Sequence, residues 1–222
     1  MSGLGSYMRI LDLFCGAGGA SMGLHRAFSE AEITGVDINP QSRYPFKFIQ
    51  ADALKFPLDG YDFVWASPPC QRYTKAGKEW RKKGYIYPDL IGEIRKRLIS
   101  SKIPFVIENV PGSPLIDPIF LNGSVFGLLV HRPRFFECSF FVRQPHIPPM
   151  KPVKMGRPIK RGDIIQPVGH FSGVWYAQEQ MEIPWMGQKD LAQAIPPAYS
   201  EYIGNEYKKY LLDRHSERGG QK

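Results

Sequence analysis

Short apolar runs, separated by polar and glycine-containing turns, occupy the first half of the chain. Runs of four to eight apolar residues bounded by such turns are typical of strands that are buried on both faces. Strands are therefore predicted at residues 9–14, 33–37, 46–49, 61–66 and 103–107. Helical patterns alternate with these strands, and this alternation predicts an α/β fold with an open sheet.

Three helices are predicted from residues that recur at helical spacing. The first includes Ser21, whose hydroxyl can cap the helix N-terminus. The second begins at Pro88 and presents one apolar face, formed by Leu90, Ile91, Ile94 and Leu98. Arg95 and Lys96 fall outside that face and are expected to point into water. A third helix, beginning at Tyr199, closes the chain.

The second half of the chain is less regular. Residues 139–187 contain many prolines and little periodicity, so they are predicted to form a small irregular region. The expected organisation is a core of residues 8–138, this irregular region, a segment of residues 188–213 that returns to the core, and a disordered tail of residues 214–222.

An excess of positive charge favours an anionic partner. The 222 residues include 29 Lys+Arg and 21 Asp+Glu, a formal net charge of +8, and such a charge suggests nucleic acid. The three cysteines form no disulfide framework, which favours a reducing cytoplasm. No apolar run approaches the roughly 20 residues that span a bilayer, so no membrane association is expected.

A glycine-rich turn follows the first predicted strand, at residues 15–21. Its glycines let the backbone approach a ligand closely. Asp37 ends the second predicted strand, where a carboxylate accepts hydrogen bonds from ribose hydroxyls, and Asp52 can accept one from an adenine amino group. The turn lacks both a phosphate-binding lysine and the Gly-x-Gly-x-x-Gly spacing. These features favour a ligand that carries a nucleoside without a pyrophosphate, such as S-adenosylmethionine.

Cys70 is the candidate nucleophile. It follows two prolines that end the strand at 61–66, and ligands bind at the carboxyl ends of strands in open α/β sheets. Nearby positive charge lowers the pKa of a thiol, and five cations soon follow Cys70. These are Arg72, Lys75, Lys78, Arg81 and Lys82. Glu108 ends the strand at 103–107 and is expected to lie near Cys70, where an apolar setting can keep its carboxyl group protonated.

Four motifs occur in the order of one enzyme family. They are Asp12-Leu13-Phe14-Cys15-Gly16-Ala17-Gly18-Gly19, then Asp37, then Ser67-Pro68-Pro69-Cys70-Gln71, and then Glu108-Asn109-Val110. The chain resembles the DNA cytosine-5 methyltransferases from about Met8 to Tyr207, as a short member whose target-recognition region, residues 139–187, is reduced. The resemblance implies the Rossmann-like α/β fold of S-adenosylmethionine-dependent methyltransferases, a mixed, mostly parallel sheet with helices on both faces. It also implies that cofactor and no metal. The cofactor-binding residues that it implies are Phe14, Gly16, Ala17, Gly18, Asp37, Ile38, Asp52, Ala53, Pro68 and Gln193.

The resemblance also implies a mechanism for methyl transfer to carbon 5 of cytosine. Cys70 would attack carbon 6 of a cytosine flipped out of double-stranded DNA, and Glu108 would hydrogen-bond or protonate ring nitrogen 3. In the Arg-x-Arg motif, Arg134 would hold the carbonyl oxygen at position 2 and Arg132 would support Glu108. The family's glutamine two places before the first arginine is Val130 here, which affects the detail of this hydrogen-bond network.

Three alternative functions remain open at the level of sequence. An RNA methyltransferase that acts on tRNA shares these motifs, and the compressed recognition region is compatible with it. A non-catalytic, cofactor-responsive DNA-binding module is disfavoured by the complete set of Cys70, Glu108 and Arg134. A subunit whose specificity comes from a separate partner is the third. The expected setting is a monomer in the cytoplasm of a prokaryote, or one encoded by a phage, associated with restriction-modification.

Overall fold

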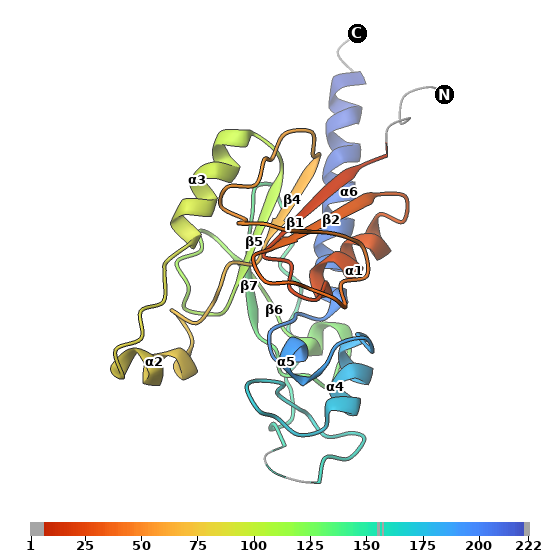
Figure 1. Cartoon of the computed structure of the whole chain (residues 1–222). Helices are drawn as coiled ribbons and strands as arrows, with labels where there is room; N and C mark the ends of the chain where they lie inside the picture. The colour runs from red at the N-terminus through yellow and green to blue at the C-terminus, as the bar shows by residue number, and fades with distance from the viewer. Residues whose placement is uncertain (1–6, 155, 157, 220–222) are drawn as a thin grey trace.

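The computed structural model describes residues 7–154, 156 and 158–219. Seven strands form one sheet in the order β3-β2-β1-β4-β5-β7-β6 (Figure 1). They are β1 (Arg9–Leu13), β2 (Glu32–Asp37), β3 (Lys47–Gln50), β4 (Phe63–Ala66), β5 (Phe105–Asn109), β6 (Ile119–Leu121) and β7 (Arg134–Cys138). The neighbouring strands among β1 to β5 are parallel, whereas β7 runs antiparallel to β5 and β6. The predicted mixed, mostly parallel sheet is confirmed.

Helices cover both faces of this sheet, as predicted. They are α1 (Gly19–Ala27), α2 (Lys75–Lys82), α3 (Ile91–Ser101), the 3₁₀ helix η1 (Gly123–Phe126), α4 (Val174–Met181), α5 (Gln188–Leu191) and α6 (Pro197–Gly219). In Figure 1, α3 lies on one face and α1 and α6 lie on the other. In the same view α2 projects to one side below the sheet, and α4 and α5 lie below its opposite side.

The continuous apolar runs of the central strands follow from this two-sided cover. Consecutive side chains of a strand point to opposite faces, so a strand covered on both faces needs apolar residues at every position. In β1, Leu11 belongs to the core cluster that contains Ile94 of α3. Its neighbour Ile10 belongs to the cluster that contains Leu24 of α1 and aromatic residues of α6. Both side chains are fully buried.

Small residues let α1 and α6 pack closely. A Cβ atom built on Gly23 of α1 would lie 2.0 Å from the carbonyl oxygen of Pro197, and one on Gly204 of α6 would lie 2.7 Å from Cβ of Ala27. Any larger side chain would push the helices apart. The hydroxyl of Ser200 donates to the carbonyl of Ala20 over 2.8 Å, which joins the same two helices. The end of the chain therefore completes the layer over α1.

Residues 139–187 have a core of their own beside the sheet. Two isolated bridges, Val130 with Ile165 and Val153 with Ile164, order its first part. A third hydrophobic cluster then joins α4 and α5. Its buried members are Ala17, Val130, Ile165, Tyr176, Ala177, Met181, Ile183, Met186 and Leu191. The region is thus less regular than the core, yet it packs against it. Within the described ranges no helix is long and apolar enough to cross a membrane.

Two local expectations at helix ends are wrong. Ser21 lies inside α1, whose N-cap is Gly18 in a left-handed conformation (φ 87°), and its hydroxyl bonds to Asp12 instead of capping. Glycine reaches this conformation without strain, so no side-chain cap is required to start the helix. At the other end, α6 continues to Gly219, so residues 214–219 of the expected disordered tail are helical. Residues 220–222 lie outside the described ranges.

Arg95 does not point into water as expected. Its side chain is 15% exposed and makes two hydrogen bonds of 2.7 Å to the carboxylate of Glu137 on β7. A third bond, also 2.7 Å, reaches the carbonyl of Pro114. A bidentate pair of this kind is among the stronger charge-assisted contacts in proteins. Arg95 therefore fixes α3 against β7, on the antiparallel side of the sheet.

Candidate active site

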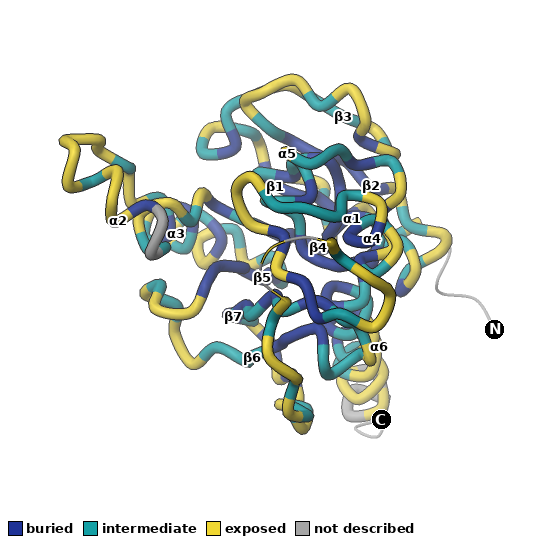
Figure 2. Tube along the Cα trace, turned by 90° about the horizontal axis from the view of Figure 1, so that it is seen from below, coloured by how far each residue is buried: buried dark blue, intermediate teal, exposed yellow. Residues whose placement is uncertain are grey.

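The sheet gathers the candidate residues at one edge. The carboxyl ends of β1, β2, β4 and β5 meet there because these strands are parallel, and the amino end of β7 joins them because β7 is antiparallel. Figure 2 views the molecule from this end. Register places Ala66 of β4 opposite Ile107 of β5 and Asn109 of β5 opposite Phe135 of β7. The loop with Cys70, the end of β5 with Glu108 and the start of β7 with Arg134 are consequently neighbours.

Asn109 holds the loop that carries Cys70. Its buried side-chain amide donates to the carbonyl of Pro68 over 2.9 Å, and its Oδ1 accepts from the backbone N–H of Val110 over 2.9 Å. The carbonyl of Cys70 accepts from the N–H groups of Tyr73 and Thr74, which closes a turn directly after the thiol. Sequence reasoning gave Asn109 no role. Its position directly after Glu108, in the Glu108-Asn109-Val110 motif, was the signal that could have revealed this role.

The environment of Cys70 differs from the one expected. Burial raises the pKa of its thiol, and the neighbouring carboxyl of Glu108 raises it further, while Arg134 and Arg132 act in the opposite direction. The expectation of a lowered pKa is wrong because burial is the largest influence on the thiol, and the cations that oppose it are not those that follow in sequence. The two arginines of the later motif take their place. A proton must therefore leave Cys70 before it can act as a nucleophile.

Glu108 is buried beside Arg134. Nε of Arg134 lies 2.7 Å from Oε1 of Glu108, and Nη1 donates to the carbonyl of Pro133 over 2.9 Å. Burial raises the pKa of Glu108, with Arg134 as the main opposing influence. Oε1 is buried without an aligned hydrogen-bond partner among the described residues. Burial thus favours the protonated form of this carboxyl group, which can donate a hydrogen bond to a ligand.

Arg132 has a different role from the expected one. It is buried, and its guanidinium donates to three backbone carbonyls: Ala194 (2.9 Å), Pro167 (2.7 Å) and Ala192 (2.8 Å). The residue that pairs directly with Glu108 is Arg134, and Arg132 influences Glu108 only through its charge. Because its three carbonyls belong to the 139–187 region and the segment after α5, Arg132 joins these parts to the active-site edge.

The glycine loop, residues 14–18, lies at the carboxyl end of β1 and is fixed by Asp37. The backbone N–H of Gly16 donates to Oδ2 of Asp37 over 3.1 Å, and Oδ1 accepts from the N–H of Asn39 over 2.9 Å. Phe14 has a left-handed φ of 58°, which is rare for a bulky residue and brings the chain sharply out of the sheet. Ala17 and Gly18, at the end of the loop, are buried. Asp37 therefore shapes the loop as well as facing the edge.

The other candidate cofactor residues surround this loop to different degrees. Ile38 is 66% exposed beside Asp37. Asp52 accepts from the N–H of Leu54 over 3.0 Å, in a turn directly beyond β3. Ala53 and Pro68 are buried. Gln193 is exposed, and the segment that follows it reaches the loop, since a Cβ built on Gly19 would lie 2.5 Å from the carbonyl oxygen of Ile195.

These groups fit a cationic nucleoside ligand such as S-adenosylmethionine. A Cβ added to Gly16 would meet no atom within 4 Å, so the backbone there is open to a ligand. The carboxylate of Asp37 makes no ion pair within the ranges that the structure describes, and it suits hydroxyl donors, whereas it would repel a phosphate. The exposed apolar side chain of Ile38 offers a surface for a purine ring. In the described part of the chain no three His, Cys, Asp or Glu side chains form a metal-binding group.

A buried polar network supports the glycine loop from below. The hydroxyl of Ser21 donates to Oδ2 of Asp12, and Oγ of Ser21 lies 2.6 Å from the hydroxyl of Tyr44. The ring of Tyr44 fills the space left by two glycines, since a Cβ on Gly18 or Gly35 would lie within 3.0 Å of it. Sequence reasoning missed Tyr44, because nothing in the polar loop that carries it indicates a buried ring.

Asp12 makes the stability of the protein depend on pH. Burial, together with the negative charges of Asp37 and Glu108, raises the pKa of Asp12 to about 7, although the hydrogen bond from Ser21 acts in the other direction. The folded state therefore holds a proton that an unfolded aspartate, with a pKa of about 3.9, releases. By linkage, this proton stabilises the folded state. The stabilisation is complete below about pH 4 and is lost as the pH rises through about 7.

We expect Asp12→Asn to remove this dependence. Wild type should lose roughly 1–3 kcal/mol of unfolding free energy from pH 5 to pH 8 as Asp12 ionises. The variant should not show this loss, because its amide never ionises. Urea unfolding at the two pH values measures the difference. An equal effect of the substitution at both pH values would show that Asp12 is not the group that titrates.

The segment of residues 71–90, named here the arm, leaves the body next to Cys70 and contains α2 (Figure 2). Its base is held by the hydroxyl of Tyr73, which donates to Asp89 over 2.6 Å, and by Nη1 of Arg72, which donates to the carbonyl of Tyr87 over 3.1 Å. Further out, Trp80 and Tyr85 pack edge to face with ring centroids 5.1 Å apart, and both are exposed. The arm thus presents aromatic rings among cations.

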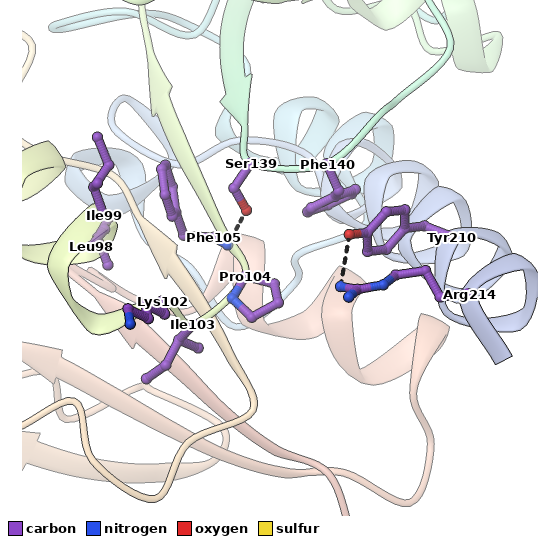
Figure 3. A pocket seen from close by; sticks show the side chains of 10 residues that line it. All are labelled: Leu98, Ile99, Lys102, Ile103, Pro104, Phe105, Ser139, Phe140, Tyr210 and Arg214. Carbon is purple, nitrogen blue, oxygen red and sulfur yellow. Dashed lines mark hydrogen bonds between the residues drawn. The ribbon is translucent and has the colours of Figure 1, made fainter. Parts of the chain in front are cut away.

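A cavity of about 270 Å³ lies at the opposite end of the molecule (Figure 3). It is lined by the last turn of α3, the start of β5 and the outer part of α6, including Lys102, Phe105 and Tyr210. These residues lie at the amino ends of the parallel strands. The cavity shares no residue with the edge that carries Cys70 and Glu108, so the candidate chemistry is not located there.

Comparison with known proteins relates part of the chain to one enzyme family. Residues 8–114 match the C-5 cytosine-specific DNA methylase family. The type II methyltransferase M.NgoMIV of Neisseria gonorrhoeae is 32% identical over 127 residues, which cover 50% of this chain and 38% of that protein. The type II methyltransferase M.HgiCI of Herpetosiphon aurantiacus is 28% identical over 138 residues, covering 56% of this chain and 31% of that protein. The chain thus spans about a third of the length of these relatives.

A solved structure supports the fold over nearly the whole chain. The Entamoeba histolytica methyltransferase EhMeth superposes with a TM-score of 0.57 and 13% sequence identity, covering 94% of this chain and 99% of that one. This likeness supports the methyltransferase fold expected from the sequence. The motifs from Asp12 to Glu108 all lie within the matched residues 8–114. Together, the match over residues 8–114 and the two type II methyltransferases support a short member of the C-5 cytosine-specific DNA methylase family.

Proposed function

We propose that this protein transfers a methyl group from S-adenosylmethionine to carbon 5 of cytosine in double-stranded DNA. S-adenosylmethionine is the cofactor of this family, and when bound it supplies an electrophilic methyl group. The observation that carries the proposal is the juxtaposition of the Cys70 loop with Glu108, whose buried carboxyl lies 2.7 Å from Arg134. A thiol, a carboxyl group with a raised pKa and a fixed cation are the three groups that activation of a pyrimidine ring requires.

Cys70 activates the ring. Carbon 5 of cytosine is a poor nucleophile, so the thiolate first adds to carbon 6, and electron density moves to carbon 5. Glu108 donates its proton to ring nitrogen 3, which stabilises the negative charge as it develops. Arg134 holds the carbonyl oxygen at position 2. Its Nη2 makes no hydrogen bond to the residues that the structure describes, and is the nitrogen assigned to this contact.

The second half of the reaction restores the thiol. After carbon 5 has taken the methyl group, its proton leaves to a base, and the electron pair of that C–H bond reforms the ring double bond as the bond to Cys70 breaks. Sulfur departs as the thiolate, so atoms and charges balance. A water molecule can take the proton, and no side chain is assigned to it. Glu108 regains its proton from nitrogen 3, by microscopic reversibility.

DNA is the proposed substrate because of the surfaces beside Cys70. A stacked cytosine exposes neither face of carbon 6 to a thiol, so the base must be flipped out of the duplex. The arm, with its cations and the exposed rings of Trp80 and Tyr85, suits phosphates and an unstacked base. We assign DNA reading to residues 139–187, as a reduced target-recognition region between the core (8–138) and the returning segment (188–213).

The setting follows from the relatives. M.NgoMIV and M.HgiCI are type II methyltransferases of bacteria, so we propose that this protein acts in the cytoplasm of a prokaryote or of a phage-infected cell, in a restriction-modification context. A separate specificity partner and action on tRNA remain the competing proposals. The observation that favours them is the small size of the region at 139–187.

A methylation assay with two substrates tests the proposal. The protein is incubated with radiolabelled S-adenosylmethionine and either duplex DNA or tRNA, each rich in cytosine. We expect label in DNA, and base-resolution mapping should place it on carbon 5 of cytosines in a short sequence context. Label in tRNA alone would overturn the choice of DNA. Label in DNA only after a second protein is added would assign specificity to a partner.

A further inference from the structure

One hydrogen bond joins the glycine loop to a residue far along the chain. The indole N–H of Trp185 donates to the backbone carbonyl of Ala17 over 2.9 Å. The methyl group of Ala17 is also buried in the third hydrophobic cluster, with Met181 and Met186, and not in the core of the sheet. The end of the 139–187 region therefore contacts the middle of the loop that is assigned to the cofactor.

Gln178 of α4 fixes the turn that carries Trp185. Its side-chain amide donates to the carbonyls of Pro184 (3.2 Å) and Met186 (2.8 Å), the two residues that flank the tryptophan. The backbone N–H of Met186 donates to the carbonyl of Ile183 over 3.2 Å within the same turn. Because one side chain holds both neighbours, a shift of α4 moves the indole with it.

The start of α4 faces solvent and carries groups that suit nucleic acid. Trp175 is 49% exposed, and the guanidinium carbon of Arg161 lies 5.9 Å from the centre of its ring. The hydroxyl of the adjacent Tyr176 accepts from the N–H of Gly162 over 3.0 Å, which ties the basic loop to the helix. Stacked cations and rings of this kind contact phosphates and bases. The helix thus connects an exposed basic surface to the Trp185 turn.

We propose that Trp185 is a positioning residue that couples occupancy of the cofactor site to DNA binding. The inference rests on the proposed function. Contacts run without interruption from the surface at Trp175 through α4 and Gln178 to Trp185 and the carbonyl of Ala17. A ligand on the glycine loop orders the Trp185 turn, and the DNA-facing surface then needs less ordering when DNA binds. By linkage, each ligand raises the affinity for the other by the same factor.

Binding measurements test this coupling. S-adenosylhomocysteine serves as the cofactor-site ligand, so that no turnover occurs, and its Kd is measured with and without a saturating duplex. The Kd of the duplex is measured with and without S-adenosylhomocysteine. For wild type we expect each ligand to tighten the other by about fivefold or more. Trp185→Phe keeps a ring but loses the N–H, and Gln178→Ala releases the turn, so both should bring the factor close to one.

Gln180→Ala is the matched control. Gln180 lies on the same helix, but its Oε1 accepts from the N–H of Leu129 over 3.0 Å, so it holds α4 to the core without touching the Trp185 turn. We expect a lower melting temperature and an unchanged coupling factor. A Trp185→Phe protein that melts earlier but keeps full coupling would show that the residue is only structural, and would overturn the inference.

The wild-type protein separates this inference from the proposed function. If it binds both the duplex and S-adenosylhomocysteine, with no effect of one on the other, the coupling is refuted while the proposed function stands. If it binds no duplex at all, the proposed function fails, and the inference fails with it. The expected result is reciprocal coupling in wild type and in Gln180→Ala, and its loss in Trp185→Phe and Gln178→Ala.

Discussion

Replacing Cys70 with serine is expected to reduce methyl transfer to DNA by at least about a thousandfold, because losing the nucleophile of a covalent mechanism commonly removes that much rate or more. Serine has nearly the same size, so the loop held by Asn109 and the binding of DNA should persist. The measurement is incorporation of labelled methyl groups into duplex DNA, with DNA affinity determined in parallel. Label retained at the wild-type rate would exclude Cys70 as the nucleophile.

A trapping experiment locates the covalent bond. A duplex with 5-fluorocytosine at the target position cannot lose fluorine as a cation, so the adduct with carbon 6 should persist and migrate as a protein–DNA conjugate. The matched control is Cys138→Ser, which changes a thiol on β7 whose sulfur contacts the carbonyl of Phe136. We expect the conjugate with wild type and Cys138→Ser, and none with Cys70→Ser.

Replacing Glu108 with glutamine is expected to slow methyl transfer by about a hundredfold, within the range typical of general acid catalysis. The amide keeps the shape of the carboxyl group and can donate a hydrogen bond to nitrogen 3, but it cannot transfer a proton. The loss should fall mainly on kcat, because the interaction strengthens as charge develops on the ring. Steady-state kinetics, which follow the formation of methylated duplex, give kcat and KM for the variant and for wild type.

The pH profile of this variant gives a sharper test. In wild type the Glu108 carboxylate, together with burial, raises the pKa of Cys70. That carboxylate is absent over the rising limb, where Glu108 is still protonated and uncharged, so a neutral glutamine should leave this limb, which reports deprotonation of Cys70, where it is. The falling limb of wild type reports deprotonation of Glu108, whose pKa burial raises, and it should disappear. A profile identical to that of wild type would contradict the assigned acid.

The central strands could be predicted because their physical environment leaves a simple pattern. Ile10 and Leu11 point to opposite faces of β1, and both are apolar because both faces are covered. Since the central strands are parallel, their carboxyl ends bring Cys70 and Glu108 to one edge of the sheet. The antiparallel pair β6 and β7 could not be found this way. β7 begins with the buried Arg134 and contains Glu137, and these charges are tolerated only because Glu108 and Arg95 pair with them.

The roles of charged residues were the hardest to infer, because proximity in sequence differs from proximity in space. The cations after Cys70 lie on the arm, whereas the arginine that pairs with Glu108 lies more than twenty residues beyond it. Arg132 was expected to support Glu108, yet its partners are carbonyls of Pro167 and of the segment after α5, which have no pattern that a sequence could reveal. The positions of Tyr44 and Trp185 are likewise set by distant backbone: Tyr44 fills the space beside Gly18 and Gly35, and Trp185 bonds to the carbonyl of Ala17.

The close seating of α6 on α1 has a consequence for synthesis of the protein on the ribosome. Gly23 meets the carbonyl of Pro197, and Ser200 bonds to Ala20, so α1 finds its cover only when α6 has emerged. Until then its apolar side is open to other nascent chains and to chaperones. Contacts of such long sequence separation also slow folding. Packing of α1 beneath the glycine loop should accordingly wait until α6 has been synthesised.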